Sequence, residues 1–155
     1  MHVRRSPRRQ RGAMIVTAAL ILLFLMGFMG IALDFGHLFV VKTELQTAVD
    51  SCALSAAREL DGQGTAITRA TSAGQTAGNA NRVNMQSSTW SGQGQIVATD
   101  ITFRDASYAV TTTPALARYA QCVHTQPNIN IWLMKAMGAF SGDTAGNPAT
   151  RSVTA

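Results

Sequence analysis

The sequence has little of what an enzyme active site needs. It contains three histidines and two cysteines, and it has no zinc-ligand spacing, no phosphate-binding glycine loop and no Gly-x-Ser-x-Gly elbow. Cys122 and His124 could face the same side of a strand, as a nucleophile and its base would. No orienting acid or oxyanion donor can be named beside them. We therefore predict that the chain is not an enzyme and uses no metal or cofactor; a small membrane-bound hydrolase built on this pair is the alternative.

Ionisable side chains are absent from Ala13 to Leu33, AMIVTAALILLFLMGFMGIAL, and Thr17 carries the one polar side chain there. A helix of this length spans roughly 31 Å, which matches a bilayer core of about 30 Å. A single segment in hydrocarbon satisfies its backbone only as an α-helix. The run predicts a transmembrane helix over 13–33, since the rest of the chain is not apolar enough to bury it as a core helix.

Acidic residues are also absent from the first twelve positions, which carry Arg4, Arg5, Arg8, Arg9 and Arg11. Basic flanks stay in the cytoplasm. This predicts a cytoplasmic tail over 1–12 and a single-pass protein of the bacterial inner membrane, with the remainder in the periplasm. These arginines account for the net charge of +5, so we expect them to contact anionic lipid headgroups and do not expect nucleic-acid binding.

A cleaved secretory signal is the alternative to a permanent anchor. Ordinary signals have a shorter apolar stretch followed by a small-residue cleavage site. Here the apolar run is longer and continues into Asp34, Phe35 and Gly36 without a break, which favours the uncleaved anchor.

Cysteine is scarce, and both cysteines, Cys52 and Cys122, fall on the predicted outer side. An oxidising compartment permits a disulfide between them. Such a bond would close a loop of about 70 residues and contribute on the order of 4 kcal/mol. Two separate buried thiols are the alternative.

Proline is absent from residues 13 to 61, so one helix can run through the span and beyond it. Past the membrane, apolar residues recur at spacings of 3 and 4, the period of an amphipathic helix. Asp61 to Gly64 should end this helix. A second helix is expected over 65–81 and folded back on the first, with an alanine seam. The first stripe comprises Leu38, Val41, Leu45, Ala48, Cys52 and Ser55, and the seam comprises Ala66, Ala70, Ala73, Ala77 and Ala80.

The rest of the chain predicts a loop and then short strands. Serine, glycine and glutamine dominate 84–95, and β-branched or aromatic residues follow. The fold class is therefore α+β, with a helical hairpin over 34–82 and a small antiparallel sheet within 83–155. We expect strands at Ile96–Phe103, Ala106–Thr112, Tyr119–Thr125 and Arg151–Thr154, and a short helix at Ile129–Met137.

Residues 8–62 resemble the N-terminal domain of TadE/TadG-like Flp pilus-assembly proteins. The resemblance rests on Arg11-Gly12 before the span, Ala32-Leu33-Asp34 and Gly36 at its exit, Lys42 to Gln46, Ala48 with Asp50, and the close Glu59-Leu60-Asp61-Gly62. It implies a membrane-anchored component of the tight-adherence (Tad) secretion and pilus machinery that acts beside pilin-like subunits. A periplasmic binding module unrelated to pili is the alternative.

In that role the helix would be the assembly surface. Small residues let transmembrane helices approach closely, and Gly27, Gly30, Ala32 and Gly36 supply them. The stripe that begins with Leu38, Val41 and Leu45 would pack on the second helix or on a neighbouring molecule. Partners would then be Flp/Tad pilus or platform proteins, or a second copy of the chain.

One position departs from pilins. Relatives processed by prepilin peptidase carry an acidic residue five positions after the cleavage glycine, and if that glycine were Gly12 the position is Thr17. A threonine cannot neutralise the freed amino terminus of a neighbouring subunit. We predict that the Gly12-Ala13 bond is not cut and that the chain does not polymerise as a major pilin.

Overall fold

The computed structural model describes residues 11–84, 95–133 and 150–155. Its helices are α1 (Arg11–Arg58) and α2 (Ala66–Asn79), with a short 3-10 turn at Ala98–Asp100. Its strands are β1 (Ile101–Arg104), β2 (Tyr119–Cys122), β3 (Thr125–Asn130) and β4 (Thr150–Thr154). The α+β class and the long apolar N-terminal helix are confirmed.

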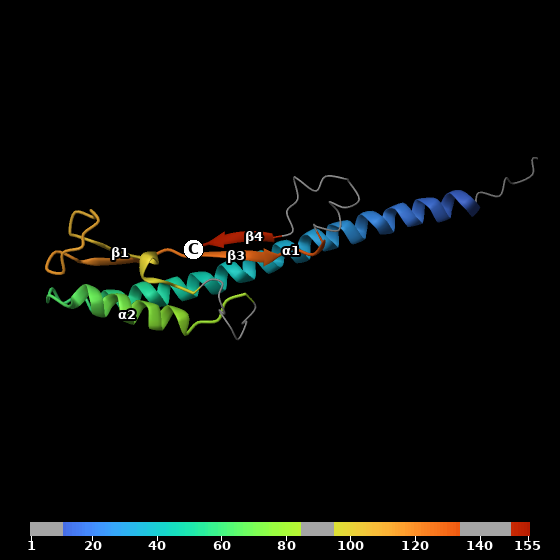
Figure 1. Cartoon of the computed structure of the whole chain (residues 1–155). Coiled ribbons are helices and arrows are strands. Elements are labelled where there is room, and N and C mark those ends of the chain that lie inside the picture. The colour runs from blue at the N-terminus through green and yellow to red at the C-terminus, as the bar shows by residue number, and fades with distance from the viewer. Residues whose placement is uncertain (1–10, 85–94, 134–149) are drawn as a thin grey trace, which may run out of the picture.

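Helix α1 forms the axis of the molecule (Figure 1). Its first part projects alone, and its second part is accompanied by α2 and by two antiparallel ribbons, β1–β2 and β3–β4. The predicted stripe of α1 is the centre of the core. Of this stripe, Val41, Leu45, Ala48 and Cys52 are fully buried, Ser55 is half-buried and Leu38 packs at the margin; the adjacent Ala56 is also fully buried.

Helix α2 packs on α1, but the seam differs from the predicted one. Its buried residues are Ala66, Ala70, Gly74 and Gly78, whereas Ala73 and Ala77 are half-buried and Ala80 is exposed. A Cβ at Gly78 would lie 3.1 Å from the Cβ of Cys52 and 2.5 Å from the Cδ1 of Ile96. The two glycines therefore set how closely the helices approach.

An ionic cluster closes the turn between the helices. The Arg69 guanidinium contacts the carboxylates of Glu59 and Asp61 and the hydroxyl of Thr65. The Gln63 backbone N–H also donates to Asp61 at 3.0 Å, and this bond, together with Arg69, lowers the pKa of that carboxyl. A group with a lowered folded-state pKa stabilises above its unfolded pKa, so this contribution is lost as the pH falls through the folded pKa.

The ribbon β1–β2 is short, and part of the predicted sheet is wrong. Of the predicted strand Ile96–Phe103, only Ile101 to Phe103 are paired; β1 continues to Arg104 and pairs with β2 in the register Ile101 to Cys122. The predicted strand Ala106–Thr112 does not form as such: it begins with a turn at 106–108, and only Val110 makes an isolated antiparallel bridge, with Arg104. The Asp105 carboxylate accepts hydrogen bonds from the Ser107 N–H and hydroxyl and from the Ala109 N–H, and these bonds lower its pKa. This arrangement uses the donors that a strand would have needed.

The ribbon β3–β4 also departs from expectation. The third predicted strand should have ended before Pro127, but β2 stops at Cys122 and β3 runs through that proline. The register shifts between Gln126 and Ile129, so Pro127 and Asn128 oppose a single residue of β4. Such a bulge accommodates a residue without an N–H. The helix predicted at Ile129–Met137 is therefore wrong at its start, and most of its remainder lies outside the described residues.

Asn79 joins α2 to the segment that precedes β1. Its amide donates to the Ile96 carbonyl at 3.0 Å and accepts from the Ile96 N–H at 2.8 Å. We expect Asn79→Ala to reduce the free energy of unfolding by about 2 kcal/mol, because two part-buried hydrogen bonds are lost. Thermal unfolding in detergent followed by circular dichroism measures this. Thr76→Ala, at an exposed position of α2, is the control and should change stability by less than about 0.5 kcal/mol; equal effects of the two substitutions would contradict the role of Asn79.

Candidate membrane-anchoring and helix-packing site

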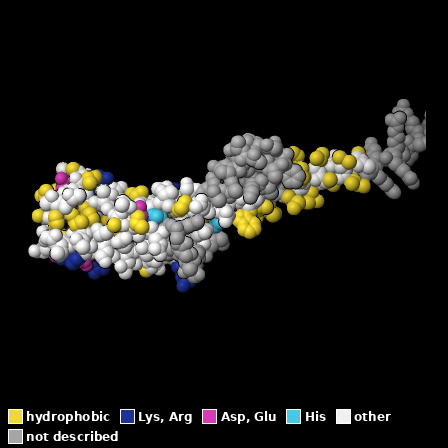
Figure 2. Space-filling view, in the orientation of Figure 1, with side chains coloured by type: hydrophobic (Ala, Val, Ile, Leu, Met, Phe, Trp, Pro, Cys, Tyr) yellow, Lys and Arg dark blue, Asp and Glu magenta, His cyan; other side chains and the backbone are white. Residues whose placement is uncertain are grey.

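The first part of α1, residues 13–33, is called the rod below. It exposes large apolar side chains on all sides. Met14, Phe24 and Met29 are 74%, 65% and 66% exposed, and the space-filling view shows this rod covered with hydrophobic atoms (Figure 2). The Thr17 hydroxyl donates to the carbonyls of Ala13 and Met14 at 3.0 Å, so its polar group is satisfied within the helix. In the part of the chain that the structure describes, α1 is the one helix long and apolar enough to cross a membrane.

This exposed surface is too large and continuous for a protein surface facing water. Lipid chains would cover these side chains without the free-energy cost of exposing apolar surface to water, since the chains are as apolar as the side chains. The amino acid pattern and the packing therefore agree that the rod needs an apolar surrounding.

Placing two arginines in the rod tests whether it needs an apolar surrounding. We expect Leu22→Arg with Leu25→Arg to remove most of the protein from carbonate-washed membranes, because each mid-span arginine costs about 2.5–3.5 kcal/mol of insertion free energy. The matched control, Leu54→Arg with Ala57→Arg, changes exposed positions in the second part of α1 and should stay in the membrane fraction. Retention of both variants would contradict a lipid-covered rod.

At the end of the rod, Asp34 holds a distant segment of the chain. Its buried carboxylate accepts hydrogen bonds from the backbone N–H groups of Trp132, at 3.2 Å, and Leu133, at 2.9 Å. One helical turn earlier, a Cβ at Gly30 would lie 2.9 Å from the Cβ of Leu133. The Gly30–Asp34 face of α1 is therefore occupied by the chain itself.

The other residues predicted to pack helices fall into two groups. Val41 and Leu45 are fully buried and Leu38 is partly buried, all within the protein's own core. Ala32 and Gly36 are exposed, nothing lies within 4 Å of a Cβ built at Gly36, and Gly27 is half-buried. Of the arginines predicted to contact lipid, Arg4, Arg5, Arg8 and Arg9 lie outside the described residues, and Arg11 begins α1.

Cys52 and Cys122 form a disulfide that joins α1 to β2, with Cα atoms 6.2 Å apart. Of the two alternatives that the sequence leaves open, the structure has the bonded one. The Cys122 sulfur is thereby committed, and His124 pairs through Nδ1 with Asp100 at 2.8 Å. The Cys122 and His124 pair therefore has no thiolate to act as a nucleophile in this form of the protein.

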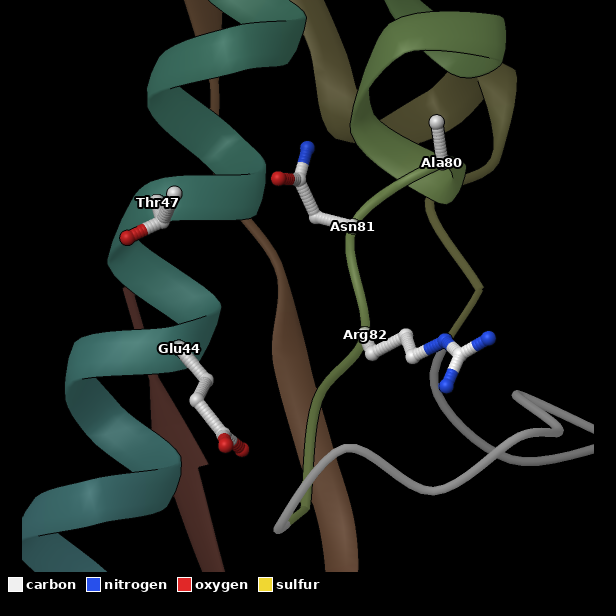
Figure 3. Close-up of a pocket in the computed structure, with 5 residues that line it drawn as sticks. All are labelled: Glu44, Thr47, Ala80, Asn81 and Arg82. Carbon is white, nitrogen blue, oxygen red and sulfur yellow. The ribbon is translucent and has the colours of Figure 1, made fainter.

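A shallow depression between α1 and the end of α2 offers little to a ligand. Glu44 and Thr47 line it from α1, and Ala80, Asn81 and Arg82 line it from the segment after α2 (Figure 3). It combines one acid and one base with no histidine or thiol. Across the described ranges, no group of three or more histidine, cysteine or acidic side chains is placed to hold a metal ion.

Sequence reasoning placed Asp34 at the span's exit but missed its role. A signal was available, because the aspartate directly follows a long run without ionisable groups. Its partners could not be found in this way, since they lie 98 and 99 residues further along the chain.

Comparison with protein-family models matches residues 12–59 to the TadE/G-like Flp pilus-assembly family. No curated protein and no solved structure matches the chain. The match coincides with α1, including the exposed rod, Asp34 and the core stripe. Residues 12–59 are therefore similar to the TadE/G-like Flp pilus-assembly family over about a third of the chain.

Proposed function

We propose that this protein is a membrane-anchored, non-catalytic structural or assembly component of the Flp/Tad pilus system. The observation that carries the proposal is the coincidence of the family match, residues 12–59, with a helix whose first part exposes apolar side chains on all sides. The anchor would fix the protein in the bilayer, and the helical hairpin with its ribbons would be the folded part presented beside the machinery.

The proposed orientation puts the N-terminus in the cytoplasm and the folded part in the periplasm. Five arginines before the span favour it, because basic flanks are retained inside. The disulfide also supports it, since such bonds persist in oxidising compartments. The inner membrane is the bilayer that separates these two compartments.

The exposed small residues at the end of the rod are the proposed contact for a neighbouring helix. Ala32 and Gly36 are four residues apart and share one helix face, so another transmembrane helix could approach the backbone closely there. The stripe that includes Val41 and Leu45 is covered within the chain. A partner, whether a pilus protein, a platform protein or a second copy, would therefore contact the rod and its exit.

Co-purification tests this role. The full chain is isolated in mild detergent from membranes of a bacterium that assembles the pilus, beside the variant Gly36→Leu. We expect pilus subunits or platform proteins with the natural chain and at least about tenfold less with the variant, since a 1.4 kcal/mol loss is tenfold in binding. An isolated monomer in both samples would contradict the assembly role.

The uncut Gly12-Ala13 bond is a separate prediction. With Thr17 at the position where processed relatives have an acid, the chain should keep its arginine tail when produced beside prepilin peptidase. Intact mass or N-terminal sequencing measures this, and a mature chain that begins at Ala13 would contradict it.

A further inference from the structure

The side chain of Trp132 is solvent-exposed although its backbone is fixed by hydrogen bonding. It is 77% exposed, although its backbone N–H donates to the buried carboxylate of Asp34. The next residue, Leu133, donates to the other carboxylate oxygen and lies against Gly30. The backbone at 132–133 is thus fixed on α1 while the indole is left without cover.

The position of this indole along α1 is specific. Asp34 is the first residue after the apolar run, and Gly30 lies one turn inside it. Phe35 and Phe39 follow at about 3 Å and about 9 Å of helix rise past Leu33, and they are 48% and 68% exposed. Exposed aromatic side chains from two distant parts of the chain therefore occur at the level where α1 leaves its apolar stretch.

We propose that Trp132, together with Phe35 and Phe39, is a second membrane contact that inserts into the headgroup interface of the bilayer. Tryptophan is enriched at this depth because its ring is apolar while its N–H needs a polar partner. The lipid interface is the occupant because the aromatic residues continue the exposed apolar surface of the rod. The inference rests on the proposed membrane crossing, and it adds that the C-terminal part of the fold is also held at the bilayer.

Asp34 is the positioning residue for this contact. Near the hydrocarbon, a backbone N–H without a hydrogen-bond partner is destabilising, and the Asp34 carboxylate satisfies two such groups. With one contact in the span and another at Trp132, the folded part would be fixed in depth and rotation against the membrane, whereas a single helix alone could rotate about its own axis.

Depth-dependent fluorescence quenching tests the proposal. The sequence has two tryptophans, so Trp90→Phe leaves Trp132 as the single reporter in the full chain. The protein is reconstituted in phosphatidylcholine vesicles brominated either near the headgroup end or near the methyl end of the acyl chains. We expect the shallow bromines to quench Trp132 at least twice as strongly as the deep ones. Adding Asp34→Ala should abolish this preference with helical content and disulfide unchanged, whereas Asp34→Asn, which keeps one acceptor oxygen, should retain part of it.

A mid-span reporter separates this inference from the anchor itself. In the variant Trp90→Phe, Trp132→Phe, Phe24→Trp, the deep bromines should quench more strongly. If that reporter is quenched while Trp132 responds only to aqueous iodide, the interfacial contact is refuted and the anchor stands. If brominated lipid quenches neither reporter, the membrane crossing is refuted as well.

Discussion

Replacing Cys52 and Cys122 together by alanine is expected to lower the unfolding midpoint of the folded part by on the order of 15 °C. The bond closes a sequence separation of 70 residues, for which the chain-entropy model gives about 4 kcal/mol. It joins the helix that supplies the core stripe to the ribbon β1–β2, so both the helical and the strand layers depend on it. Circular dichroism during heating in detergent measures the midpoint.

Reduction of the natural chain is the control for this substitution. It should lower the midpoint by a similar amount, since it removes the same cross-link without changing side-chain volume. Alkylation of the unreduced, denatured protein should add no mass. Two alkyl adducts, or an unchanged midpoint after complete reduction, would contradict the structural role of the bond.

Gly78→Val is the second substitution with a large expected effect. It should lower the free energy of unfolding by about 2–3 kcal/mol. A Cβ at this position would meet the Ile96 side chain and the Cys52 Cβ, and the Ala48 carbonyl lies 3.3 Å away. The Ile96 methyl can turn aside, but the Cys52 and Ala48 atoms belong to or adjoin the α1 backbone. Helix α2 must therefore move away from α1, and the unfolding midpoint falls.

Gly36→Val is the matched control, because a Cβ there would have nothing within 4 Å. It should leave the midpoint nearly unchanged. Because Gly78 lies against Cys52, the effects of Gly78→Val and of disulfide removal should not add. Similar losses in Gly36→Val and Gly78→Val would show that glycine itself, rather than the close approach, determines stability.

The long helix and its buried face were predictable because their signals are local. The absence of proline and the spacing of 3 and 4 between apolar residues from Leu38 onward are properties of nearby residues. The face of the helix that this spacing predicts to be apolar is the face buried in the core. The second helix was predictable for the same reason, but its interface was not. Helix propensity alone counts Gly74 and Gly78 as unfavourable, whereas in the structure their missing side chains let the two helix backbones approach closely.

The strands were harder to predict because their boundaries depend on long-range hydrogen bonds. The Ile96 backbone bonds to Asn79 and residues Ala98–Asp100 form a 3-10 turn, so strand pairing begins only at Ile101. Asp105 collects the donors of its own turn, which a strand propensity based on composition does not detect. Pro127 signalled the end of a strand, yet a two-stranded ribbon tolerates it at a bulge opposite β4.

In the candidate site, too, features set by neighbouring residues were predictable and features set by distant residues were not. The apolar run from Ala13 to Leu33 can be recognised in the sequence, as can its length, which is enough to cross a membrane. The occupant of the Gly30–Asp34 face is not, because Leu133 arrives there through the folding of the whole chain. Sequence alone assigned Gly30 to contact with another helix, and the structure places the chain's own segment on it.

Protease protection in spheroplasts tests the central claim, that α1 crosses the inner membrane with the folded part outside the cytoplasm. Antibodies against residues 1–12 and against the folded part follow the two ends of the natural chain. We expect external protease to remove the folded part under reducing conditions and to leave the arginine tail intact until the membrane is lysed. Loss of the tail with survival of the folded part would contradict it.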